Sequence, residues 1–215
     1  MQTSITPMVV VENAGTLRTS CSQALRAPTS ATVQEAIFSR DQGDPAMEEP
    51  KLPRVVRTMR PMTVKVFLRT SGLFVANDAF VINTNASAEV PIARMSEVFR
   101  RHMLFLQERP TEIVDIGTFV LTEEAYPHQI IDMVSRPNSS MMLAHIHACM
   151  SRKLMNTRNG FTADGTEYVC QVSILGQVWF VSAIYSHDEY GWVLDAYMAD
   201  DPVKVSKGAH FCCIC

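Results

Sequence analysis

The sequence predicts an α+β domain in which an N-terminal hairpin and a C-terminal three-stranded meander form an antiparallel sheet, packed with about three helices. Apolar residues alternate with polar ones in several segments, as in half-buried strands, and recur at helical spacing in others. A long irregular arm shows neither pattern. The predicted boundaries are 1–61 for the arm, 62–200 for the globular domain and 201–215 for a cysteine-rich tail.

The composition is that of a globular protein with one domain and appendages, since 47% of the 215 residues are hydrophobic and 19% are charged. The formal net charge of -3 argues against a general nucleic-acid binder, so no nucleic acid is expected as a partner. No apolar run is long enough to cross a membrane, and the N-terminus lacks the basic and apolar regions of a secretory signal. We therefore expect a cytoplasmic protein or a component of a virus particle.

Prolines interrupt the arm, and Ser, Thr and Ala fill the intervals between them. Only 30–40 resembles a helix, because Val33 and Ile37 lie four residues apart on one face. A segment of this kind buries little surface against itself, so we expect the arm to lie against another subunit. The prolines are Pro7, Pro28, Pro45, Pro50 and Pro53.

Strands and helices follow one another from residue 62. Apolar and polar residues alternate in 62–70, and a turn at 71–72 leads to 73–82, which is predicted to pair back as a hairpin. A helix is predicted at 91–108, with its apolar residues on one side and Glu108 on the polar side. Further helices are predicted at 124–135 and 140–157, and further strands at 112–121, 166–175, 177–186 and 191–199, the last three forming the meander.

The tail holds three of the six cysteines in its last four residues. His210, Cys212, Cys213 and Cys215 are all able to bind zinc, which prefers four such ligands. Adjacent cysteines rarely occupy two corners of one tetrahedron, so a zinc site would combine two of these residues with a remote cysteine such as Cys149 or Cys170.

Other chemistry is open to the same tail. Cys213-Ile214-Cys215 resembles the Cys-x-Cys ending that is doubly prenylated in Rab-type small GTPases, and Cys212–Cys215 has the form of a C-a-a-X box. The resemblance covers three residues, and the chain lacks the GxxxxGK[ST] phosphate loop of that family. A disulfide to a neighbouring chain is another alternative, and an apolar tail packed against the sheet is the plainest one.

A nucleophilic site is also conceivable in the meander. Cys170, His187 and Asp195 are a nucleophile, a base and an orienting carboxylate, provided that the strands place them together. No helix N-terminus or flanking cation marks Cys170 as activated, and alternation places it on the face of Tyr168 and Val172. A buried, unreactive cysteine is the simpler interpretation.

These observations predict a non-enzymatic subunit of a larger assembly, such as a virus particle, whose partners are other protein subunits or further copies of itself. The arm and the tail would supply the contacts. Trp179 and Trp192 belong to a dense aromatic set in the meander, so with Cys212, Cys213 and Cys215 they are candidate intermolecular contacts. A small hydrolase with a Cys/His site and a zinc-stabilised interaction module are the alternatives.

Overall fold

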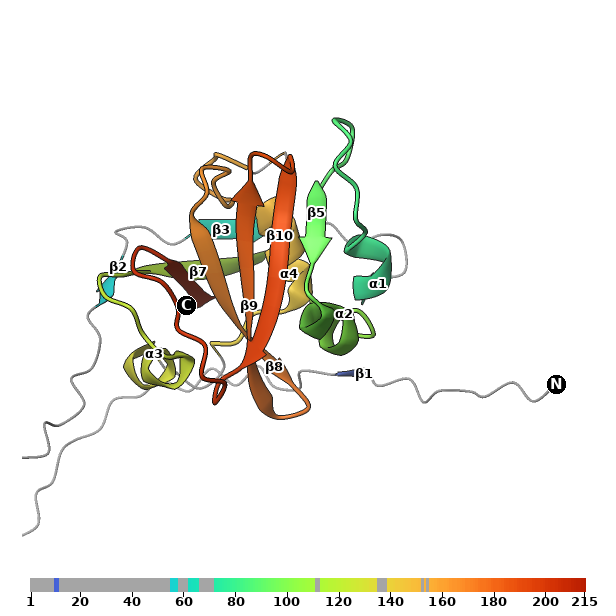
Figure 1. Cartoon of the computed structure of the whole chain (residues 1–215). Helices are drawn as coiled ribbons and strands as arrows, with labels where there is room; N and C mark the ends of the chain where they lie inside the picture. The colour runs from blue at the N-terminus through green and yellow to red at the C-terminus, as the bar shows by residue number, and fades with distance from the viewer. Residues whose placement is uncertain are drawn as a thin grey trace, which may run out of the picture. The chain divides into compact units, whose positions relative to one another are not determined.

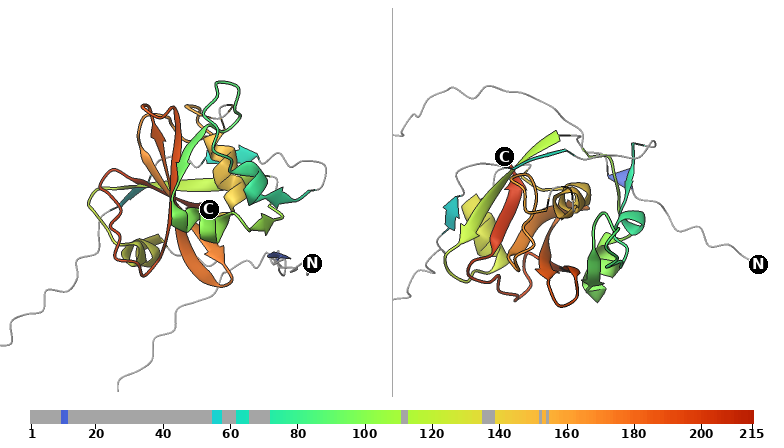
Figure 2. Two further views of the ribbon diagram at one scale, coloured as in Figure 1. Left: turned by 45° about the vertical axis from the view of Figure 1, so that its right-hand side comes forward. Right: turned by 90° about the horizontal axis from the view of Figure 1, so that it is seen from above.

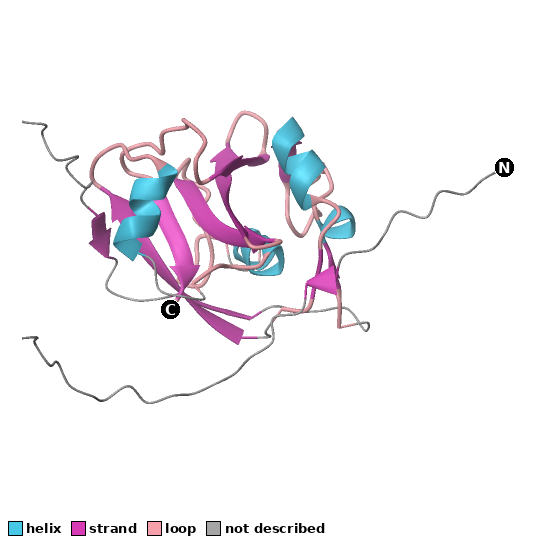
Figure 3. Ribbon diagram, turned by 90° about the horizontal axis from the view of Figure 1, so that it is seen from below, coloured by secondary structure: helices cyan, strands magenta, loops and turns pink. Residues whose placement is uncertain are grey.

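The strands dominate the part of the chain that the structure, a computed structural model, describes (Figure 3). All of the described residues belong to one compact unit. The helix predicted at 30–40 and the turn at Ser71 lie outside them. The described residues are 10–11, 55–57, 62–65, 72–110, 113–134, 139–151, 153 and 155–215.

Over the ranges just given, the main sheet has eight strands and mixes parallel with antiparallel pairs. Its order is β2-β7-β11-β8-β9-β10-β5, and β3 pairs with β7. The pairs β10–β5 and β11–β8 are parallel, and the others are antiparallel. The strands are β2 (Val55–Arg57), β3 (Met62–Lys65), β5 (Ile92–Met95), β7 (Ile113–Leu121), β8 (Glu167–Ile174), β9 (Gln177–Ser186), β10 (Gly191–Met198) and β11 (His210–Ile214).

The predicted tail is a central strand of this sheet. β11, dark red in Figure 1, lies between β7 and β8, with Ile214 opposite Ile116 and Cys212 opposite Cys170. Both faces of the sheet are covered at this point, so the residues that follow His210 in the strand are all apolar and do not alternate with polar ones. The tail therefore completes the sheet.

In the part of the chain that the structure describes, four short helices flank the sheet. They are α1 (Ala76–Ala79), α2 (Glu97–Met103), α3 (Pro127–Val134) and α4 (Leu143–Met150). The hydroxyl of Ser96 accepts the N–H of Phe99 at 3.1 Å and so begins α2. Side chains from α1, α2 and α4 belong to one core cluster and those of α3 to another, and α1 lies next to α2 in both views of Figure 2.

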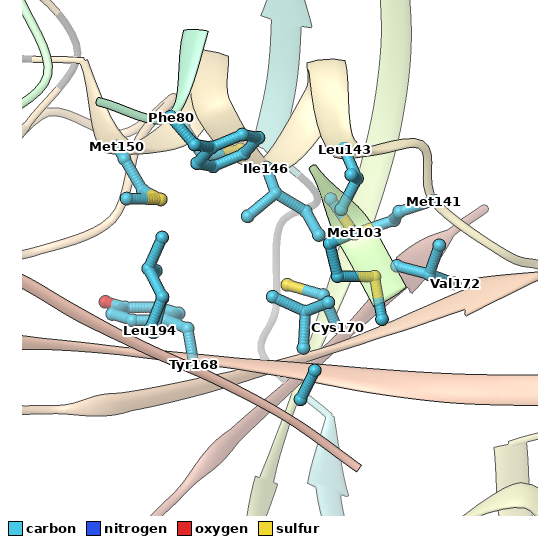
Figure 4. Close-up of a cluster of buried hydrophobic side chains, with 14 of the residues drawn as sticks. Phe80, Met103, Met141, Leu143, Ile146, Met150, Tyr168, Cys170, Val172 and Leu194 are labelled. Atoms are coloured by element: carbon cyan, nitrogen blue, oxygen red, sulfur yellow. The ribbon is translucent and has the colours of Figure 1, made fainter. Parts of the chain in front are cut away.

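Among the described residues, the core consists of two clusters on opposite faces of the sheet. The larger lies under α1, α2 and α4, and Figure 4 shows Cys170 within it among apolar side chains. The smaller lies under α3 and the segment that precedes β11. Its buried members are Leu121, Ala125, Ile130, Val169, Phe180, Tyr197, Val205, Ala209, Phe211 and Cys213.

The predicted fold class is wrong, because the sheet is mixed and the helices are minor. The segment 91–108 begins as β5, and Ser96 delays the helix; the spacing of Ile92 and Met95 suits either element. The hairpin at 62–82 does not form, because β3 pairs with β7 instead. Conversely, β8, β9 and β10 are antiparallel neighbours, as predicted for the meander.

Candidate functional site

A second, smaller sheet joins the arm to the body of the chain. It consists of β1 (Val10–Val11), β6 (Gln107–Glu108) and β4 (Phe74–Val75), with β6 in the middle. β4 is antiparallel to β6, whereas β1 is parallel to it and places Val10 opposite Gln107. An extended segment from the arm thus adds a strand to the open edge of β6, which is the geometry of strand addition in peptide recognition.

Glu108 fastens the receiving strand to α4. Its two carboxylate oxygens accept the N–H groups of Leu143 and Ala144, each at 3.0 Å. These are the first two residues of α4, whose N–H groups have no partner within the helix and whose dipole favours a negative charge. The side chain is 7% exposed. The backbone of β6 therefore pairs with the arm, while the side chain of Glu108 holds α4 in place.

Burial raises the pKa of Glu108 above its ordinary value of 4.5, and the two backbone hydrogen bonds oppose this only in part. Because the folded-state pKa is raised, the contribution of Glu108 to stability is complete below the unfolded pKa and is lost as the pH rises through the folded pKa. The two N–H donors thus offset part of the cost of burying this carboxyl group.

Glu108→Gln should remove this pH-dependent contribution and lower the free energy of unfolding at neutral pH by about 1–3 kcal/mol, because an amide offers one acceptor for two donors. Urea unfolding of both proteins from about pH 4 to about pH 8 measures the two effects together. Equal pH profiles in the two proteins would contradict the assigned pKa shift.

The surroundings of β6 are closely packed. The backbone N–H of Ala76 donates to the carbonyl of Leu106 at 3.0 Å, which joins α1 to the start of β6. The ring of His147, from α4, lies 5.7 Å from the ring of Phe74 and 5.3 Å from that of Phe80. Burial lowers the pKa of His147, so the neutral ring fits this aromatic contact. Contacts with α1 and α4 therefore position the part of the chain that receives β1.

The structure does not bring Cys170, His187 and Asp195 together. Cys170 lies opposite Val181 and belongs to the larger core cluster, whereas the exposed Asp195 is on the other face of the sheet. His187 lies in the turn beyond β9, six residues after Val181, which is about 20 Å along a strand. Burial raises the pKa of Cys170 well above its ordinary value, so the thiol is not an activated nucleophile.

The four tail residues proposed as zinc ligands are divided between two faces. His210 and Cys212 point toward the larger cluster, whereas Cys213 belongs to the smaller one and Cys215 is exposed. Within the described ranges no group of three or more His, Cys, Asp or Glu side chains is placed to hold a metal ion. The four candidate zinc ligands are therefore close in the sequence but point in different directions from β11.

Of the candidate intermolecular contacts, only Cys215 is exposed. Trp192 is fully buried and donates its indole N–H to the carbonyl of Met150 at 3.1 Å. Trp179 is 6% exposed and stacks on His102, with 4.7 Å between the ring centroids. The two tryptophans therefore hold the core of their own chain.

Sequence reasoning missed Glu108 as a functional residue. It placed this carboxylate on the solvent face of a helix, whereas the structure places it in β6 at the end of α4. The partner groups are backbone N–H groups 35 and 36 residues away, so no local pattern marks the contact.

No protein-family model matches the chain, and neither a curated protein nor a solved structure matches it significantly. Within the described residues, none of the helices combines the length and the apolar character needed to cross a membrane.

Proposed function

We propose that this chain is a non-enzymatic subunit of a larger assembly, such as a virus particle, and that its N-terminal arm provides the strand by which copies associate. The observation that carries the proposal is the parallel pairing of β1 with β6. Contacts with α4 through Glu108 and with β4 also hold the receiving strand, so its position does not depend on β1 alone.

The pairing is open to exchange between copies. Strand addition relies on main-chain hydrogen bonds, which are the same whichever molecule supplies the strand. Val11 and Val55 are separated by residues 12–54 in the sequence, so β1 belongs to a part of the chain far from the strands of the main sheet. The partner that this geometry favours is a second copy of the chain.

The alternatives receive less support from the placement of their residues. A hydrolase would need Cys170 beside His187, and a zinc module would need the cysteines of β11 on one face. The buried contacts of Cys170 and Cys212 instead suit a structural role. The compartment and the kind of particle stay predictions.

The test compares full-length variants of β1 by native mass spectrometry over a range of concentrations. Val10→Pro combined with Val11→Pro removes two backbone N–H groups and should weaken self-association about 5- to 30-fold, the value of one to two hydrogen bonds. The matched control, Val10→Ala with Val11→Ala, keeps both N–H groups and should associate nearly as tightly as the wild type.

Two results would overturn the proposal. One is a wild-type protein that stays monomeric at every concentration, and the other is an oligomer that the proline variant forms as readily as the alanine control.

A further inference from the structure

Three cysteines from distant parts of the chain meet in the larger core cluster. Cys149 comes from α4, Cys170 from β8 and Cys212 from β11, and all three are fully buried. They are free thiols in the structure. The contact between β1 and β6 proposed above does not involve these three cysteines.

Cys170 and Cys212 occupy directly opposite positions on neighbouring strands. β8 and β11 run parallel, the two residues are register partners, and both side chains enter the same cluster. Neighbouring strands lie about 4.8 Å apart, and disulfides join residues whose Cα atoms are about 4.4–6.8 Å apart. After burial, Cys212 is the neighbour that raises the pKa of Cys170 most, which agrees with this register. The register thus provides the separation that a disulfide needs without movement of either strand.

The third thiol is less well placed. Cys149 lies in the same cluster but on a helix that packs over the sheet, so it is not a register partner of either of the other two cysteines. Cys213 follows Cys212 directly but belongs to the cluster on the opposite face of the sheet. Among these neighbours, Cys212 is therefore the partner that the strand register assigns to Cys170.

We propose that Cys170 and Cys212 form a cross-strand disulfide under oxidising conditions, which fastens β11 covalently to β8. The inference is independent of the role of the arm, because it depends only on the order and register of the main sheet. The disulfide then cross-links β11, the strand between β7 and the meander, in a redox-dependent way.

Because Cys170 and Cys212 are fully buried, a small oxidant such as hydrogen peroxide is the one expected to reach them. The thiolate of one cysteine attacks an oxygen of hydrogen peroxide, the O–O bond breaks, and a sulfenic acid and water are formed. The sulfur of the other cysteine then displaces the hydroxyl group, which leaves as a second water, and the S–S bond forms. Two thiols are oxidised by two electrons in total, and one peroxide is reduced to two waters.

Burial makes this reaction slow. The Cys170 thiol is desolvated and holds its proton firmly, so the reactive thiolate is scarce until β11 and β8 open transiently. The exposed Cys215 has no such barrier. We therefore expect oxidation to reach Cys215 first and the buried pair later, at a rate that follows the opening of the sheet.

The test treats full-length protein with hydrogen peroxide, blocks the remaining thiols and maps disulfide-linked peptides by mass spectrometry. The wild type should lose two hydrogen atoms per intramolecular link and yield a peptide pair that contains Cys170 and Cys212. The midpoint of thermal unfolding should rise by roughly 5–10 °C and return to its starting value on reduction with dithiothreitol.

Variants of β11 separate this pair from the other thiols. Cys212→Ala should abolish the link, whereas Cys213→Ala, its neighbour on the opposite face, should leave the link intact. Three results would overturn the proposal. They are a link from Cys170 to Cys149, a link that survives in Cys212→Ala, and a Cys170 thiol that stays reduced after an incubation in which the backbone N–H groups of β8 and β11 have fully exchanged with deuterium. Circular dichroism of each variant before oxidation checks that it is folded.

Discussion

Deletion of residues 210–215 should prevent the protein from folding. The deletion removes β11, which pairs with β7 on one side and with β8 on the other. Without it, β7 and β8 each lose the partner on one edge, and both core clusters lose buried side chains, Cys212 from one and Phe211 from the other. Exposed strand edges with apolar faces favour aggregation, so we expect insoluble or unfolded protein.

Two milder changes at the same strand act as controls. Phe211→Ala removes one fully buried ring and should cost about 3–5 kcal/mol of unfolding free energy. Cys215→Ala changes an exposed side chain and should have little effect on that free energy. Solubility and circular dichroism report on the deletion, and urea unfolding reports on the single substitutions. A folded, stable deletion variant would show that β11 is not part of the native sheet.

Trp192→Ala should be among the most damaging single substitutions, with a loss of about 4–6 kcal/mol of unfolding free energy. The indole is fully buried, makes edge-on contacts with Phe161 and Tyr185, and donates to the carbonyl of Met150. The substitution therefore creates a cavity and leaves a buried carbonyl without its donor. Because whole domains are stable by about 5–15 kcal/mol, the variant should be close to unfolded at room temperature.

Trp192→Phe separates the two effects, since it keeps most of the ring but loses the donor and should cost about 1–3 kcal/mol. Phe105→Ala, at a side chain that is 51% exposed, should change the unfolding free energy by no more than about 0.5 kcal/mol. Chemical unfolding of the three variants beside the wild type measures the series. Equal losses at Trp192 and Phe105 would contradict the core position of the indole.

Local periodicity was enough to predict the meander but not the sheet that contains it. β8, β9 and β10 are long, adjacent in sequence and separated by short turns, so alternation alone identifies them. β11 pairs with strands that lie far from it in the sequence, and a short run of Phe and Cys carries no sign of such partners. β5 was missed for a related reason, because Ile92 and Met95 fit a helix as well as a strand.

The candidate site was harder to predict than the fold. Cysteine and histidine attracted attention through their chemistry, yet Cys170 is buried in β8, opposite Val181 of β9, whereas His187 lies in the turn six residues beyond Val181. The residue that matters for β6 is a single carboxylate, Glu108, whose partners are main-chain groups of α4. Main-chain partners are the same in every sequence, so only the three-dimensional arrangement reveals them.

The position of β11 also constrains how the protein is made. One of the two edges of β7 has no partner strand until residues 210–214 have been synthesised. Nearly ninety residues follow Leu121, the last residue of β7, before β11 begins. Helix α4 and the meander are able to form earlier, because their contacts are more local. A nascent chain that stalls before β11 therefore displays an unpaired apolar edge, and we expect it to depend on chaperones during translation.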